Sequence, residues 1–176
     1  MDDVSIKGLI EALLFASPHP LTIDGIARII QDCNKGEIRE AINGLMEEYV
    51  SPDRGVCLEE VAEGYQLRTR PEYTEWIRRL EGISHPKLSK AALETLAVIA
   101  YKQPIIKADI EGVRGVDTGG VLKTLLEKRL IKIIGRKEMP GRPIVYGTTK
   151  EFLELFSLKD LSSLPTLKDI DRDGIG

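Results

Sequence analysis

The sequence predicts a mainly α-helical protein with small β-hairpins, an α+β fold made of two tandem winged-helix domains. The first reason is an internal repeat, because residues 16–21 and 69–73 resemble residues 100–105 and 148–152. The second is that each copy places three helices before a two-stranded hairpin, which is the winged-helix order. The third is composition: 42% hydrophobic residues in a 176-residue chain can supply two small cores.

Three helices are predicted to open the first copy. The first has apolar residues at helical spacing and ends at the turn over residues 17–20. Its stripe is Ile6, Leu9, Ile10, Leu13 and Leu14. Thr22 is expected to cap the second helix, whose inward residues are Ile26, Ala27, Ile29 and Ile30. The third helix carries Ile38, Ala41, Ile42, Leu45, Met46 and Tyr49 on one face.

A hairpin and a closing helix are predicted to complete this copy. Residues 56–62 and 65–69 form the strands, joined by a turn at Glu63–Gly64. Pro71 occupies the favoured first position of the closing helix. That helix is expected to cover the core with Tyr73, Trp76, Ile77 and Leu80.

The second copy is predicted to repeat this order. Ser89 caps its first helix, and Pro104 stops it. The inward face of this helix is expected to hold Leu93, Leu96, Ala97 and Ala100. A short helix over residues 107–113 ends near Gly115, and Asp117 caps the third helix. The third helix is expected to bury Val121, Leu122, Leu125 and Leu126.

The strands of the second copy are predicted at residues 130–134 and 144–148, around a proline-bounded turn at 139–143. Its closing helix carries Phe152, Leu153, Leu155 and Phe156. The predicted boundaries are therefore one domain at residues 1–82, a linker at 83–87, a second domain at 88–157 and a flexible tail at 158–176.

Residues 1–87 carry 16 Asp/Glu and 10 Lys/Arg, whereas residues 88–160 carry 9 Asp/Glu and 13 Lys/Arg. The second domain is thus the better candidate for an anionic surface, although ordinary surface variation also produces so small a difference.

Targeting and catalytic signals are not evident. No apolar run approaches the roughly 18 residues that cross a bilayer, and residues 1–3 lack a signal peptide's positive start, so we expect a cytoplasmic protein with no membrane partner. Cys33 and Cys57 are expected to be inert thiols. His19 and His85 each adjoin a proline, with no catalytic arrangement around them.

Two further sequence features are better explained by a structural role than by ligand binding. Gly119–Gly120 lacks the pattern of a phosphate-binding loop and is expected to allow a neighbouring segment to approach closely. Glu59 and Glu60 are adjacent on a predicted strand, so their side chains point to opposite faces rather than to one metal. We expect no enzymatic activity, no cofactor and no metal site.

Basic residues gather on the second hairpin and the helix before it. They are Lys123, Lys128, Arg129, Lys132, Arg136, Lys137 and Arg142. DNA-binding winged helices use these elements, so Arg136, Lys137 and Arg142 are candidate contacts to DNA phosphates. The start of the third helix, residues 117–120, carries an acid and two glycines that are poorly suited to reading bases. DNA binding is therefore expected to be at most weak and non-specific.

The assembled motifs resemble the bacterial segregation and condensation protein B family over nearly the whole chain. In the first half they are EALLFAS (11–17), PL (20–21), LRTRPEY (67–73) and WI (76–77). The densest run extends from LSKAALETL (88–96) to IAYKQPI (99–105). The others are RGV (114–116), GVL (120–122), GRK (135–137), PGRP (140–143), YGTT (146–149) and LP (164–165). Departures at Pro18–His19 and Met139 affect only loops.

This resemblance implies a non-enzymatic subunit of the SMC–kleisin, condensin-like complex that supports chromosome condensation and segregation at the nucleoid. It implies a homodimer, formed chiefly by the N-terminal domain, that binds a kleisin of the segregation and condensation protein A family and reaches the SMC ATPase through it. Candidate partner contacts are Tyr101, Lys102, Gln103 and Met139, although each can instead shape a turn. Helix-in-groove and strand-addition binding both remain open. The alternative hypothesis is a tandem winged-helix transcription regulator that binds duplex DNA.

Overall fold

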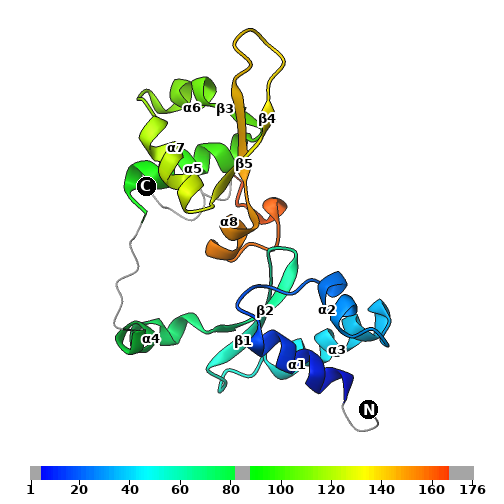
Figure 1. Ribbon diagram of the computed structural model, residues 1–176. Helices are drawn as coiled ribbons and strands as arrows, with labels where there is room; N and C mark the ends of the chain where they lie inside the picture. Colours follow the sequence, from blue (N-terminus) through cyan, green and yellow to red (C-terminus); the bar gives the residue numbers. More distant parts are fainter. Residues whose placement is uncertain (1–4, 82–87, 167–176) are drawn as a thin grey trace. The chain divides into compact units, whose positions relative to one another are not determined.

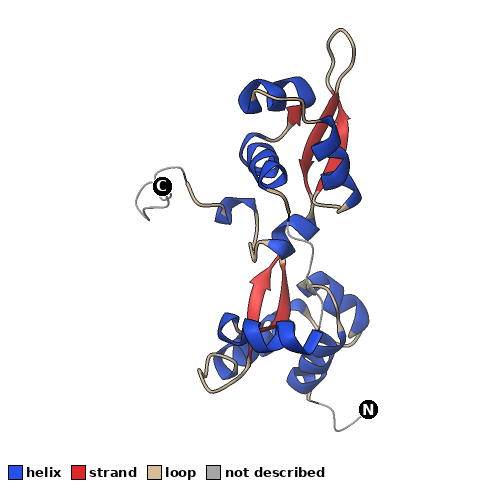
Figure 2. Ribbon diagram, turned by 90° about the vertical axis from the view of Figure 1, so that its left-hand side faces the viewer, coloured by secondary structure: helices blue, strands red, loops and turns tan. Residues whose placement is uncertain are grey.

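The computed structural model describes residues 5–81 and 88–166, which divide into two compact units. Unit 1 comprises Met1–Ser84 together with Ser157–Gly176, and unit 2 comprises His85–Phe156. Each unit combines a cluster of helices with an antiparallel hairpin, as Figures 1 and 2 show. The fold is therefore α+β, as predicted. The predicted linker at residues 83–87 lies outside the described residues.

Three capped helices form the body of unit 1: α1 (Ile6–Ala16), α2 (Ile23–Ile29) and α3 (Lys35–Glu48). The predicted cap at Thr22 is confirmed, since its hydroxyl accepts the Gly25 N–H at 3.0 Å. Asn34 and Glu37 form a capping box at the start of α3. These side chains satisfy N–H groups that a helix leaves without partners in its first turn.

The core of unit 1 lies between these helices and the hairpin. It contains Ile10, Leu14, Ile26, Ile38, Ile42, Leu45, Tyr49 and Leu58. Most of the predicted stripes are confirmed, but Ile6 and Ile29 are 38% and 55% exposed rather than inward. Because successive helical residues are about 100° apart, the apolar positions between 26 and 30 cover more than one face of the helix. A two-turn helix such as α2 can bury only part of them.

The hairpin consists of β1 (Val56–Val61) and β2 (Gly64–Thr69), with Val61 opposite Gly64. Its turn is Ala62–Glu63 rather than the predicted Glu63–Gly64, and both turn residues have positive φ, 51° and 63°. Gly64 instead belongs to β2. A Cβ there would lie 2.9 Å from the backbone of Leu21, which forms a β-bridge with Tyr65. Glycine is therefore required for close approach of two backbones and not for the turn.

The closing segment of unit 1 is a short 3-10 helix, η1 (Pro71–Tyr73), followed by α4 (Thr74–Glu81). Pro71 begins it as predicted. The prediction that this helix covers the core is wrong, because Trp76 is 60% exposed and Leu80 86% exposed. The principal contacts of α4 are with η1, and Figure 1 shows α4 apart from the cluster of α1, α2 and α3.

The chain after unit 2 returns to unit 1 as a segment that we call the strap, residues 157–163. The N–H groups of Ala62 and Glu63 donate to the carbonyls of Leu158 and Lys159, each at 2.8 Å. The strap ends in a 3-10 helix, η2 (Leu161–Ser163). The predicted flexible tail therefore includes a segment that backbone hydrogen bonds hold on unit 1, and the remainder at 167–176 lies outside the described residues.

Unit 2 repeats the architecture of unit 1. Its elements are α5 (Lys90–Lys102), β3 (Ile105–Ile106), α6 (Lys107–Arg114), α7 (Gly119–Glu127), β4 (Ile131–Arg136), β5 (Ile144–Thr148) and α8 (Lys150–Leu155). The strand order is β3-β5-β4, and all pairs are antiparallel. The unpredicted β3 pairs Ile105 with Tyr146, as Leu21 pairs with Tyr65 in unit 1. The sequence repeat thus extends to a matching tertiary contact, in the element order expected for a winged helix.

The inward face of α5 differs from the prediction. Its buried residues are Ala92, Thr95, Leu96, Ile99 and Ala100. Leu93 is 44% exposed, and Ala97 is also exposed. The helix therefore turns a different face inward from the predicted one. Both faces of α5 carry apolar residues, so the spacing alone did not distinguish them.

The ends of the remaining helices of unit 2 also differ in part from the prediction. Gly115 ends α6 with φ 70°, as predicted. The N-cap residue of α7 is Thr118 rather than the predicted Asp117, although the Asp117 carboxylate accepts the Gly119 N–H at 3.4 Å as well as pairing with Lys107 at 2.9 Å. Of the two glycines predicted to allow a close approach, a Cβ at Gly119 would lie 3.2 Å from Lys107 Nζ, whereas Gly120 has open space around it. At the other end of the unit, Leu155 and Phe156 are 53% and 41% exposed, so α8 buries only the first two of its predicted apolar residues, Phe152 and Leu153.

Candidate partner-binding surfaces

An apolar helix face is exposed on α4. We call it the α4 surface, and it consists of Tyr73, Trp76, Ile77 and Leu80. These positions are three or four residues apart, so they lie on one side of the helix. The rings of Tyr73 and Trp76 are 6.4 Å apart at a 60° angle, which extends the apolar area along this side. Because so much of this face is in contact with water in a single copy, it is available to a partner.

Charged residues of both signs accompany this face. Arg79 forms an ion pair with Glu75 one turn earlier, and Arg78 is exposed nearby. The acidic residue precedes the basic ones along the helix. A second copy of the helix that runs in the opposite direction would consequently bring Glu75 of each helix near Arg78 and Arg79 of the other.

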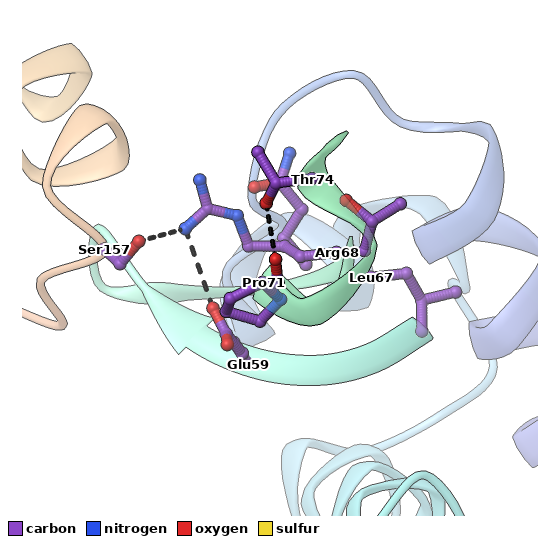
Figure 3. Close-up of a pocket in the computed structure, with 8 residues that line it drawn as sticks. Glu59, Leu67, Arg68, Pro71, Thr74 and Ser157 are labelled. Carbon is purple, nitrogen blue, oxygen red and sulfur yellow. Dashed lines mark hydrogen bonds and ion pairs between the residues drawn. The ribbon is translucent and has the colours of Figure 1, made fainter. Parts of the chain in front are cut away.

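The start of α4 also borders an open pocket of about 390 Å³ in unit 1 (Figure 3). Arg68 lies across the pocket, and its guanidinium donates to the Ser157 hydroxyl at 2.8 Å and lies 3.6 Å from the Glu59 carboxylate. On the opposite wall, the Thr74 hydroxyl donates to the Pro71 carbonyl at 2.7 Å. The lining is mostly polar and consists of Glu59, Gln66, Leu67, Arg68, Thr69, Pro71, Thr74 and Ser157.

In unit 2 the predicted partner residues at the end of α5 have different environments. Tyr101 is 44% exposed, and Lys102 is also exposed. Gln103 is half-buried and binds Thr148: its amide oxygen accepts the Thr148 N–H at 2.8 Å, and its amide nitrogen donates to the Thr148 hydroxyl at 2.9 Å. A Cβ at Gly147 would lie 2.9 Å from that amide oxygen, so glycine makes room for it. Gln103 thus joins α5 to β5 and has little left to offer a partner.

The hairpin of unit 2 carries the other predicted residues and two exposed isoleucines that were not predicted to be exposed. Met139 is 42% exposed, and Ile133 and Ile134 are 53% and 49% exposed. Consecutive residues of a regular strand point to opposite faces, but β4 is an edge strand with a register shift between Ile133 and Gly135. We call Ile133, Ile134 and Met139 with Arg136, Lys137 and Arg142 the wing surface. Gly135 inside the strand is the sequence signal of this bulge, and it would have indicated that the alternation of faces breaks after Ile133.

The wing surface is cationic, since its three basic residues outnumber the exposed Glu138 that lies among them. Arg136 donates to the Arg142 carbonyl at 3.0 Å across the hairpin, which orients its guanidinium. Within residues 5–81 and 88–166, none of Arg136, Lys137 and Arg142 forms an ion pair with a carboxylate. At the start of α7, by contrast, the hydrogen bond from Lys107 lowers the pKa of Asp117, so this end carries a stable negative charge. The charges favour anionic contact at the hairpin and oppose it at the start of α7.

Metal-ligating side chains do not cluster among the described residues. No group of three or more His, Cys, Asp or Glu side chains among them could hold a metal ion. Both cysteines are free, and burial is the main cause that raises the pKa of the Cys33 and Cys57 thiols. His85 lies outside the described residues. None of the described helices combines the length and apolar character that a membrane span requires.

Several known proteins are similar to this chain. A family model for "Segregation and condensation complex subunit ScpB" matches residues 8–167. Segregation and condensation protein B of Syntrophotalea carbinolica is 53% identical over 169 residues, which is 96% of this chain and 85% of that protein. The ScpB crystal structure from Mycobacterium tuberculosis is 32% identical, with a TM-score of 0.41 over 89% of this chain and 99% of that one. A crystallised dimer of a ScpB N-terminal domain with a ScpA peptide is 28% identical, with a TM-score of 0.39 over 42% of this chain and 91% of that one.

Proposed function

The chain belongs to the family of segregation and condensation complex subunit ScpB, and we propose that it is a non-enzymatic, homodimeric subunit that binds the kleisin of a bacterial SMC complex. In this role it supports chromosome condensation and segregation without hydrolysing nucleotide itself. The observation that carries the proposal is that each unit exposes an apolar surface, the α4 surface in unit 1 and the wing surface in unit 2. Two separate surfaces suit a protein that binds a copy of itself and a different partner.

The α4 surface supports self-association. Exposed tryptophan and leucine side chains lose contact with water when a second copy covers them. A two-fold interface places the same patch on both copies, so the patch must complement itself. The acidic start and basic middle of α4, Glu75 against Arg78 and Arg79, meet this condition when the two helices are antiparallel. We assign dimerisation to the predicted N-terminal domain, residues 1–82, on this basis.

The wing surface and the exposed end of α5 support kleisin binding by the predicted second domain, residues 88–157. Ile133, Ile134 and Met139 supply apolar area, and the neighbouring arginines and lysine supply positive charge. An apolar surface with a charged rim is the usual composition of a protein interface. Tyr101 and Lys102 stay candidate contacts, whereas the hydrogen bonds of Gln103 favour a structural role.

The test is co-purification with the cognate kleisin after the oligomeric state has been measured. Analytical ultracentrifugation of the purified chain is expected to show a dimer, and the mixture is expected to show a complex with the kleisin. A nucleotide hydrolysis assay of the chain alone is expected to show no activity. A monomer at all concentrations that also fails to bind the kleisin would remove the basis of the proposal.

A second candidate function is duplex DNA binding through the unit 2 hairpin. The three cations of the wing surface favour it, because they form no ion pair with a carboxylate in the part of the chain that the structure describes. Phosphate contacts release counterions, so such binding weakens steeply with salt. Replacing Arg136, Lys137 and Arg142 together by glutamine should abolish it, with Lys90→Gln as a control on the same unit. Tight binding that the triple variant does not change would exclude the hairpin as the site.

A further inference from the structure

We propose that the hairpin turn of unit 1 is a docking site for an extended polypeptide, and that the strap is its resident, exchangeable occupant. The turn residue Ala62 is only 3% exposed, although the two central residues of a hairpin are normally in contact with water. The strap covers it. Its consecutive carbonyls, those of Leu158 and Lys159, accept the N–H groups of Ala62 and Glu63 at 2.8 Å each.

The backbone of the turn explains why a peptide binds there. In a two-residue turn with both φ angles positive, the central N–H groups take no part in the strand ladder. Left without water or protein acceptors, such groups are costly to bury. Two successive carbonyls of an extended segment satisfy both of them together, so the turn recognises a peptide backbone rather than a single side chain.

Side chains on either side of the turn select the segment. Arg68 donates to the hydroxyl of Ser157 at 2.8 Å, at the edge of the pocket in Figure 3. On the other strand, Glu60 forms an ion pair with Lys159 at 3.0 Å. The site therefore takes a segment with a hydroxyl residue, then any residue, then a cation, which is the order Ser157, Leu158, Lys159. The pocket of Figure 3 adjoins this site through Arg68 and Ser157, which line it.

The contacts of the strap suit exchange. Asp160 caps the strap's own 3-10 helix by accepting the Ser162 and Ser163 N–H groups at 2.8 and 3.2 Å, so the segment holds its shape without help from the hairpin. Leu161 is 43% exposed and Leu158 is half-buried, so neither leucine of the strap is fully buried, and two backbone hydrogen bonds and one ion pair join the strap to the hairpin. Segments with few buried apolar contacts open without global unfolding. A second segment of the same chemistry can then take the place of the strap.

Hydrogen exchange of the Ala62 and Glu63 amides in the full chain tests the docking contact. The wild type should protect both amides. Lys159→Glu should speed their exchange by about two- to fivefold, the range set by one exposed ion pair, and Glu60→Lys should do the same. The double variant Glu60→Lys with Lys159→Glu should restore protection. Lys128→Glu, an exposed charge reversal in unit 2, should leave both rates unchanged.

Exchange is tested with a labelled synthetic peptide of residues 157–166. It should bind the full-length Lys159→Glu chain saturably, bind the wild type more weakly because the strap competes, and restore amide protection. A peptide carrying glutamate at the position of Lys159 should bind less well. Fast exchange of both amides in the folded wild type would overturn the docking site. Protected amides with no peptide binding to Lys159→Glu or to Glu60→Lys would show that the strap is a permanent part of unit 1 and overturn the exchange.

Discussion

Replacing Trp76 by alanine is expected to weaken self-association strongly while leaving unit 1 folded. Trp76 is 60% exposed in a single copy, so a second copy can cover most of its ring. A tryptophan side chain presents on the order of 200 Å², which makes about 120 Å² available. At roughly 25 cal/mol per Å² this amounts to about 3 kcal/mol per copy. A two-fold interface loses that amount twice, about 6 kcal/mol, or roughly four orders of magnitude in Kd.

The loss of about 6 kcal/mol in dimerisation free energy is an upper bound, because alanine keeps some contact and a second copy does not cover the ring completely. We therefore expect the Kd of the dimer to rise at least about a hundredfold. Sedimentation equilibrium over a wide concentration range measures it, with Leu93→Ala, an exposed leucine of unit 2, as the matched control. Since the chain has a single tryptophan, its fluorescence gives an independent measurement. Dilution of the wild type should shift the emission to longer wavelength as the dimer separates.

Two results would refute the reasoning. One is a Trp76→Ala chain that remains folded and dimerises with an unchanged Kd. The other is a wild-type dimer in which Trp76 emits as a fully hydrated indole. Either result would show that the α4 surface faces water or another partner in the dimer. Circular dichroism and thermal unfolding establish that the variant is folded.

Three further outcomes are expected. Gly64→Ala should destabilise unit 1 by about 1–3 kcal/mol in urea unfolding, because its Cβ would lie 2.9 Å from the Leu21 backbone, whereas Gly112→Ala, with open space, should be neutral or stabilising; equal stability of both would contradict the close approach. Cys57 should react with iodoacetamide at pH 8 more slowly in the folded chain than in urea, because burial and then Glu59 raise the pKa of its thiol; equal rates would argue against this environment. The hydrogen bond from Lys107 lowers the pKa of Asp117, so its stabilisation is present above the ordinary Asp range and lost as the pH falls through the lowered pKa. The stabilities of the wild type and Lys107→Met, compared by urea unfolding, should therefore converge in acid, and a constant difference would exclude this pair as the cause.

Local patterns in the sequence predicted much of the fold. Apolar spacing located the α1, α3 and α7 helices, and Thr22 and Ser89 cap helices as expected, because a capping hydroxyl acts on an N–H group only a few residues away. The family resemblance from short motifs is confirmed by the family model and by relatives such as the Syntrophotalea protein. The roles of the candidate partner residues stay predictions.

The errors arose where a residue's environment depends on distant parts of the chain. Trp76 and Leu80 have the spacing of core residues, and only the position of α4 shows that they face outward. The spacing of Leu93 predicts an inward position, but α5 is apolar on more than one face and the structure leaves Leu93 exposed. Ile133 and Ile134 are exposed together because of a bulge in β4, which depends on pairing with β5.

The sequence by itself determined the two-fold repeat, the types of its elements, the uneven charge and the family, because each of these is carried by residues near one another in the chain or by composition. Only the tertiary structure decided which apolar faces are left for partners and that the strap returns to unit 1. The physical reason is that the two hydrogen bonds between the strap and the turn join backbone N–H and carbonyl groups, which every residue other than proline has in the same form. Contacts of this kind leave no residue pattern, so they become visible only when the chain is folded.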